Sequence, residues 1–225
     1  MAESERWTVN VGDERTSAIV ERVESPLHDT VLLLAHGAGG HMEHRHMTEL
    51  AAQLRSRGLH VVRFNFLYKE KKAGPPDRMP RLMETFAAVV AKVREMLSPR
   101  HLIIGGHSMG GRVASMMAAN QFACDGLLLL AYPLHPSGQP QKLRDAHLAQ
   151  ISVPTLCLNG TRDELCTKEL MENVVANLPS TFVLHWLEAA DHSFHVLTKS
   201  GRTDEEVLDE VGGATHAWVE RIVHI

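Results

Sequence analysis

The sequence contains a serine, an aspartate and a histidine that could together perform nucleophilic catalysis. A serine hydroxyl is a poor nucleophile near neutral pH, so it needs a base to remove its proton and a carboxylate to orient that base. Ser108, Asp163 and His192 supply these three groups, in that chain order. We interpret them as the nucleophile, the acid and the base of an acyl-transfer or hydrolysis reaction.

The surroundings of Ser108 favour this interpretation. An apolar, strand-like segment at 101–104 precedes it, and a helical pattern at 112–119 follows it. The intervening Gly106, Ser108 and Gly110 form a Gly-x-Ser-x-Gly turn, whose glycines permit a tight strand-to-helix connection. Such a turn exposes the hydroxyl and places the N–H of Met109 at a helix start, where it can face a developing negative charge.

A second glycine-rich turn, residues 36–40, follows the apolar segment 30–35. Glycine-rich turns also bind phosphates, but Met42 stands where a dinucleotide-binding fingerprint requires its third glycine, and no Gly-Lys-Ser/Thr follows. The N–H of Ala38 is therefore predicted to complete an oxyanion hole with that of Met109. His36 is interpreted as a buried residue that orients this turn.

Other residues could replace the chosen acid and base. Glu164 is adjacent to Asp163, and His195 lies three residues beyond His192. Asp163 and His192 are favoured because each closely follows a strand-like segment, as the order serine, acid, histidine requires. His185 falls inside a strand and is expected to be structural.

The elements that must position these residues form a regular series. Short β-rich segments at 7–11 and 17–23 predict an N-terminal antiparallel hairpin. Apolar strands then alternate with amphipathic helices, which predicts an α/β fold with a mostly parallel sheet and helices on both faces. Strands are expected at 30–35, 60–66, 101–104, 127–132, 153–158 and 181–187, and helices at 44–57, 81–97, 112–119, from about 167 and from 203.

Length and composition favour a single globular domain over several other classes of protein. The 225 residues suit a single domain spanning 1–225, and a net charge of -4 with 44% hydrophobic residues favours neither disorder nor a nucleic-acid partner. No apolar run is long enough for a membrane span, and the polar N-terminus does not resemble a secretory signal. Three cysteines without C-x-x-C spacing indicate reduced thiols and a cytoplasmic protein without a zinc site. The sequence leaves the oligomeric state open.

Two irregular segments are expected near the site. The stretch 133–152 is the only candidate for a lid, and it is short. The loop 67–80 is rich in proline and in the cations Lys69, Lys71, Lys72 and Arg78. It should border the pocket, where Arg78 could bind an anionic substrate; the alternative is a solvated surface loop.

The chain resembles the α/β-hydrolase superfamily, and within it the small cap-less dienelactone-hydrolase-like members and a testis-expressed-hydrolase-like subgroup. The resemblance lies in residues 34–40, 63–66, 75–78 and 108–112. It implies the α/β-hydrolase fold, the same roles for Ser108, Asp163 and His192, and no cofactor. Dienelactone hydrolases use a cysteine nucleophile, so their substrate does not carry over to a serine. The subgroup also includes the hydrolase-like domain of a chromatin-complex scaffold.

These observations predict a serine hydrolase that cleaves a small ester, thioester or related acyl substrate. The alternatives are a hydrolase-fold interaction module without turnover and a cofactor-free perhydrolase or acyltransferase. No membrane partner is expected.

Overall fold

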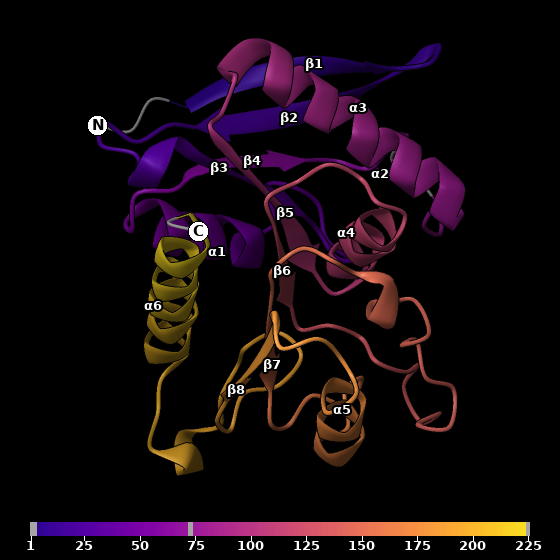
Figure 1. Cartoon of the computed structure of the whole chain (residues 1–225), viewed down its shortest axis with the longest axis vertical. Helices are drawn as coiled ribbons and strands as arrows, with labels where there is room; N and C mark the ends of the chain where they lie inside the picture. The colour runs from indigo at the N-terminus through magenta and orange to yellow at the C-terminus, as the bar shows by residue number, and fades with distance from the viewer. Residues whose placement is uncertain (1–3, 72–73, 224–225) are drawn as a thin grey trace.

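The computed structural model describes residues 4–71 and 74–223, which form an eight-stranded sheet with helices on both faces (Figure 1). The strand order is β1-β2-β4-β3-β5-β6-β7-β8. The strands are β1 Ser4–Val11, β2 Glu14–Glu21, β3 Thr30–Ala35, β4 His60–Phe64, β5 His101–His107, β6 Gly126–Leu130, β7 Thr155–Gly160 and β8 Phe182–Leu187. The helices are α1 Arg45–Arg55, α2 Leu67–Glu70, α3 Met79–Leu97, α4 Met109–Ala119, α5 Lys168–Val175 and α6 Asp204–Val223, with short 3-10 helices at Leu27–Asp29, Leu148–Gln150 and Thr198–Ser200.

The predicted α/β architecture is confirmed. Strands β1 and β2 form an antiparallel hairpin, β2 pairs antiparallel with β4, and all other pairings are parallel. The hairpin is longer than the β-rich segments indicated, because polar residues extend both strands. At the sheet edge one face of β1 meets water, so its exposed positions alternate with buried Trp7, Val9 and Val11.

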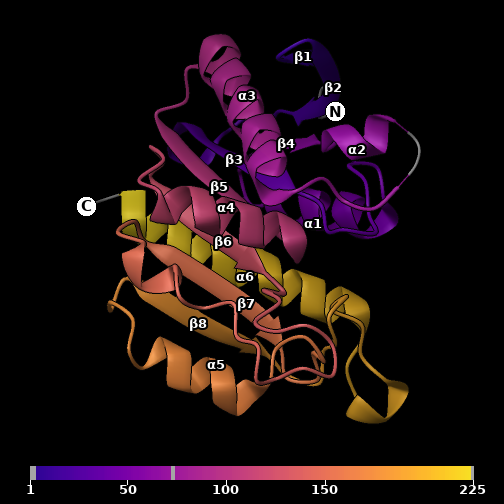
Figure 2. The same ribbon diagram turned by 90° about the vertical axis from the view of Figure 1, so that its right-hand side faces the viewer.

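Each face of the sheet carries its own hydrophobic core. On one face α1 and α6 pack over alternate strand residues, among them Leu32 and Leu34 of β3. On the other face α3, α4 and α5 cover the intervening residues, such as Val31 and Leu33. Figure 2 shows this second layer of helices in front of the sheet, with α6 behind it. The period of two along each strand thus divides its side chains between the two cores.

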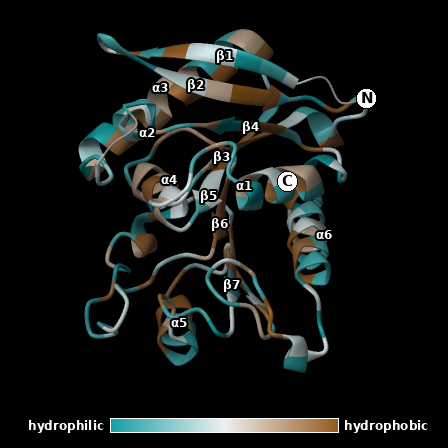
Figure 3. Ribbon diagram, turned by 180° about the vertical axis from the view of Figure 1, so that it is seen from behind, coloured by the Kyte–Doolittle hydropathy of each residue, from teal (hydrophilic) through white to brown (hydrophobic). Residues whose placement is uncertain are grey.

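The central strands are apolar on both faces, as a covered parallel sheet requires. All six residues of β3 and all five of β6 are buried. In Figure 3 these strands are mostly brown, whereas the edge strand β1 carries teal stretches. Within the described residues, no helix is both long and apolar enough to cross a membrane.

The segment 67–80 is more regular than its prolines and charges suggested. Residues Leu67–Glu70 form α2, because Leu67 and Tyr68 are buried in the core and fold back as a helical turn. Helix α3 begins at Met79, two residues earlier than expected, since Pro80 is well suited to a first helical turn. Lys72 lies outside the described residues.

Candidate active site

Ser108 occupies a strained turn between β5 and α4. Its backbone angles are φ 53° and ψ -118°, a conformation that non-glycine residues rarely adopt. The turn is tight because α4 packs directly on the end of β3: a β-carbon on Gly110 would lie 2.4 Å from the carbonyl oxygen of Ala35. The Ser108 N–H donates to the carbonyl of Leu130 at 2.8 Å, which secures the turn to β6. This geometry is that of the predicted strand–turn–helix elbow.

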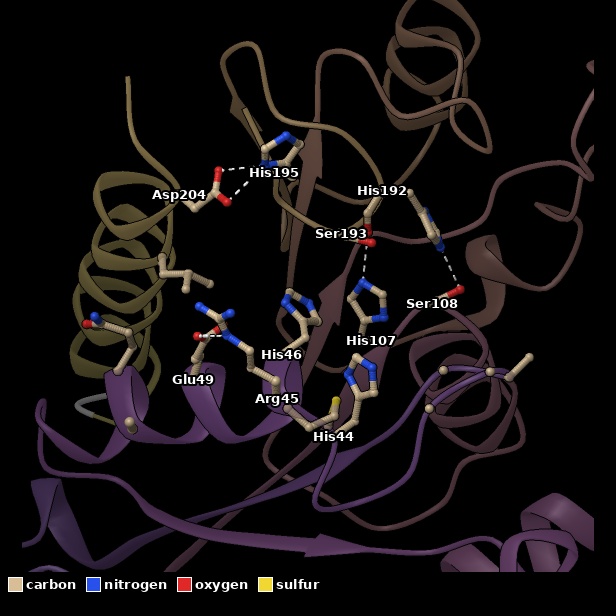
Figure 4. Close-up of a pocket in the computed structure, with 18 of the residues that line it drawn as sticks. His44, Arg45, His46, Glu49, His107, Ser108, His192, Ser193, His195 and Asp204 are labelled. Atoms are coloured by element: carbon tan, nitrogen blue, oxygen red, sulfur yellow. Dashed lines mark hydrogen bonds and ion pairs between the residues drawn. The ribbon is translucent and has the colours of Figure 1, made fainter. Parts of the chain in front are cut away.

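The structure brings Ser108, His192 and Asp163 into one chain of hydrogen bonds (Figure 4 shows the serine and the histidine). His192 Nε2 lies 2.8 Å from Ser108 Oγ, and His192 Nδ1 lies 2.8 Å from Asp163 Oδ2. A carboxylate can only accept, so Nδ1 carries the proton and Nε2 is free to accept the serine proton. The three residues come from loops after β5, β7 and β8, at the carboxyl edge of the sheet.

The carboxylate of Asp163 is held in a fixed orientation. Its side chain is fully buried, and its Oδ1 accepts the backbone N–H of Leu165 at 2.8 Å. The Asn159 amide donates to Oδ2 at 3.3 Å and also to the carbonyl of Tyr132 at 3.1 Å. Asn159 was not predicted from the sequence. The signal available was an amide side chain directly after the apolar strand expected at 153–158.

His107 is a second residue that sequence reasoning missed. Its Nε2–H donates to the backbone carbonyl of His192 at 2.8 Å, which ties the loop carrying the candidate base to the strand before the serine. Burial lowers the pKa of His107 well below its usual value, so the ring is neutral. The signal available in the sequence was a polar side chain directly before Ser108.

The competing residues point elsewhere. His195 Nδ1 lies 2.9 Å from Asp204 Oδ2, and this hydrogen bond raises the pKa of the imidazole. Asp191 Oδ1 accepts the N–H groups of Ser193 and His195, so it shapes the turn and does not contact the imidazole of His192. Glu164 is exposed.

His185 Nε2 lies 2.8 Å from Glu210 of α6, which fits the structural role expected of it.

The turn 37–40 lies against the serine. His36 is buried as expected; its Nδ1–H donates to the carbonyl of Gly37 at 2.7 Å, and its Nε2 accepts the N–H of Phe66 at 3.2 Å. Ala38 lines the same cleft as Ser108, and Met109 is the first residue of α4. The role of their N–H groups as an oxyanion hole stays a prediction.

A cleft of about 940 Å³ opens beside Ser108 (Figure 4). Its walls are the turn 37–40, one side of α1 from Arg45 to Gln53, the loop 192–195 and the first turns of α6. Of the residues that the structure describes in 133–152 and in 67–80, none lines this cleft, which differs from the expected lid and border. Arg78 is exposed just before α3, and its contact with a substrate stays a prediction. In residues 4–71 and 74–223 no group of three or more histidine, cysteine or acidic side chains is arranged to hold a metal ion.

Three histidines beneath and beside the site predict acid lability. Burial lowers the pKa of both His36 and His46 to about 4, and that of His107 also falls. The unfolded chain takes up these protons near pH 6.5, so between that value and about pH 4 it binds more protons than the folded chain. The stability present above pH 6.5 is therefore lost as the pH falls to about 4, by roughly 3 kcal/mol from the fully buried His36 alone.

Urea unfolding at pH 7, 5.5 and 4 measures this loss. His46→Gln should reduce the dependence on pH. His41→Gln, which alters an exposed ring with only a minor electrostatic effect on the pKa of His36, should change it much less. An equal free energy of unfolding at pH 7 and pH 4 would contradict the expectation.

Comparisons with known proteins agree with this architecture. Residues 28–220 match a family model described as an alpha/beta hydrolase domain. A lid-less α/β serine hydrolase from Xanthomonas campestris is similar at 23% identity and a TM-score of 0.77, over 97% of this chain and 94% of that one.

Two further solved structures share the fold. An α/β serine hydrolase homologue from Coxiella burnetii has 24% identity and a TM-score of 0.73, over 92% of this chain and 96% of that one. A dienelactone hydrolase from Anabaena variabilis has 18% identity and a TM-score of 0.77, over 98% of both chains. Since the family model spans most of the sequence, the chain belongs to the alpha/beta hydrolase domain family.

Proposed function

We propose that this hydrolase cleaves a small ester, thioester or related acyl substrate through an acyl-enzyme intermediate on Ser108. The observation that carries the proposal is the continuous hydrogen-bond chain from a strained serine, through His192, to a buried carboxylate at a cleft of about 940 Å³. The solved serine hydrolases and the esterase domain of a Rhodothermus marinus protein, which share the fold, support the same class of reaction.

The geometry suits a two-step mechanism. Ser108 Oγ attacks the substrate carbonyl while His192 Nε2 accepts its proton, and Asp163 stabilises the imidazolium that forms. His192 then donates the proton to the leaving group, and the acyl group remains on Ser108. A water molecule, deprotonated by His192, attacks the acyl-enzyme and regenerates the serine.

The developing negative charge is assigned to the N–H groups of Ala38 and Met109. Met109 begins α4, so the positive end of the helix dipole adds to its N–H. Such preorganised donors contribute several kcal/mol to catalysis in related chemistry, because they need no reorganisation during the reaction.

A series of p-nitrophenyl esters, from acetate to palmitate, together with an acyl thioester, tests the proposal. We expect saturable turnover that is fastest with short to medium acyl groups, since the cleft is open and no lid lines it within the described part of the chain. An active-site-directed fluorophosphonate should also label the protein. Absence of both turnover and labelling would favour the interaction module without catalysis.

A further inference from the structure

The turn 37–40, which carries the proposed oxyanion donor Ala38, cannot be made rigid by its own side chains. A β-carbon on Gly37 would lie 3.3 Å from both Ser108 Cβ and His107 Nδ1, so a small residue is needed where the turn approaches the serine. Gly39 and Gly40 follow within three residues. Glycine-rich backbone is flexible, and an oxyanion donor must be fixed before the reaction to be effective. The turn therefore has to be held by groups outside it.

Those groups come from one neighbouring segment, the end of β4 and the helix α2. The hydroxyl of Tyr68 donates to the carbonyl of Ala38 at 2.8 Å, and Lys69 Nζ donates to the carbonyl of Gly39 at 3.3 Å. Asn65 Oδ1 accepts the N–H of Met42 at 2.9 Å, and the Arg63 guanidinium donates to the Met42 carbonyl. The turn is thus held in its middle, at Ala38 and Gly39, and just beyond its end, at Met42.

The contacts on Ala38 fix the orientation of its N–H. A trans peptide unit is planar, and its C=O and N–H point in opposite directions. The Gly37 carbonyl accepts from His36 Nδ1–H at 2.7 Å and from the Gly40 N–H at 3.1 Å, so the N–H of Ala38 is directed away from those donors. Tyr68 holds the next carbonyl, that of Ala38 itself. Both peptide units flanking Ala38 are consequently fixed.

Tyr68 is well placed for this contact. Its side chain is buried, and its ring stacks on Phe66 with an interplanar angle of 16°. Its backbone N–H donates to Asp77 Oδ2 at 3.1 Å, which secures α2. Burial raises the pKa of the phenol, so the hydroxyl keeps its proton and remains a donor.

We propose that Tyr68 is a positioning residue for the oxyanion hole. Its hydroxyl holds the peptide unit that follows Ala38 and, together with the contacts on the preceding unit, preorganises the Ala38 N–H that stabilises the tetrahedral intermediate. This inference rests on the proposed function. It assigns the beginning of the 67–80 segment to the support of the transition state.

Tyr68→Phe removes only the hydroxyl and keeps the packed ring. The chain provides a matched control, because its other tyrosine, Tyr132, is also buried and its hydroxyl donates to the backbone carbonyl of Arg144 at 2.6 Å, away from the turn. Tyr132 contacts Asn159 only through its backbone N–H and carbonyl, which the substitution by phenylalanine keeps. We expect Tyr68→Phe to lower kcat for p-nitrophenyl acetate about tenfold with KM within about twofold, since the lost contact acts in the transition state. Affinity for a trifluoromethyl ketone, which forms a tetrahedral adduct, should fall about tenfold as well. Tyr132→Phe should change both by less than about twofold.

A second measurement does not depend on turnover. In nuclear magnetic resonance relaxation, the amides of Ala38 and Gly39 should become more mobile in Tyr68→Phe and stay rigid in Tyr132→Phe. If the wild-type protein neither hydrolyses nor labels, the proposed function fails while this measurement still tests the contact. Unchanged amide mobility overturns the inference, as does an equal loss of kcat in the two variants or a rise in KM without a loss of kcat.

Discussion

Replacing Ser108 with alanine is expected to lower kcat for a p-nitrophenyl ester by about 10⁴-fold or more and to abolish labelling by a fluorophosphonate. In the proposed mechanism the Ser108 hydroxyl accepts the acyl group, and it lies 2.8 Å from His192 Nε2, the proposed base. Alanine keeps the β-carbon and with it the backbone strain at φ 53°, so the thermal unfolding temperature should stay close to that of the wild type.

Ser193 provides the matched control for this substitution. It is an exposed serine that lines the same cleft, and its backbone N–H, not its hydroxyl, is held by Asp191. Ser193→Ala should keep both labelling and most of kcat. Labelling that survives in Ser108→Ala would place the nucleophile elsewhere.

His192→Ala is expected to lower kcat by about 10³-fold or more, because removal of the base leaves only the oxyanion hole and substrate binding. His195→Ala should change kcat by less than about threefold, since its imidazole is paired with Asp204 and does not reach Ser108. Steady-state kinetics on the same ester compares the two variants directly.

The ranking of the two histidine variants decides the assignment of the base. A larger loss in His195→Ala than in His192→Ala would contradict it. Thermal unfolding of both variants serves as a control, because the His195–Asp204 pair lies at the start of α6 and its removal acts on that helix.

Much of the fold could be predicted because hydrophobic periodicity reports which residues face a core. The continuous apolar run of β3 required cover on both faces, and the structure places helices on both. The capping box at Thr203 and Glu206 was also predictable from local sequence, and its two reciprocal hydrogen bonds are present. Local rules succeed where the interacting groups are close in the chain.

The segment 67–80 shows where such rules fail. Its prolines and charges suggested an irregular loop beside the substrate. The structure instead folds Leu67 and Tyr68 into a buried helical turn, and the Tyr68 hydroxyl reaches Ala38, thirty positions earlier in the chain. Burial against a distant element decided this geometry, and a pattern of local composition carries no information about it.

The candidate site was likewise predictable only in part. The positions of Ser108, Asp163 and His192 after three parallel strands, β5, β7 and β8, followed from topology, since the carboxyl ends of parallel strands meet at one edge. The supporting contacts from Asn159 and His107 depend on how the loops meet across that edge; His107 and His192 are 85 residues apart. The cleft between α1 and α6 was not predictable either, because it arises from the packing of two helices distant in sequence.

Trapping the acyl-enzyme tests whether Ser108 is the nucleophile. A slowly deacylating ester is mixed with the protein, the reaction is quenched in acid within seconds, and the adduct is located by mass spectrometry of proteolytic peptides. We expect one acyl group per chain on Ser108, formed at a rate at least equal to kcat and absent from Ser108→Ala. Turnover without any adduct on Ser108, or with the acyl group on another residue, would contradict it.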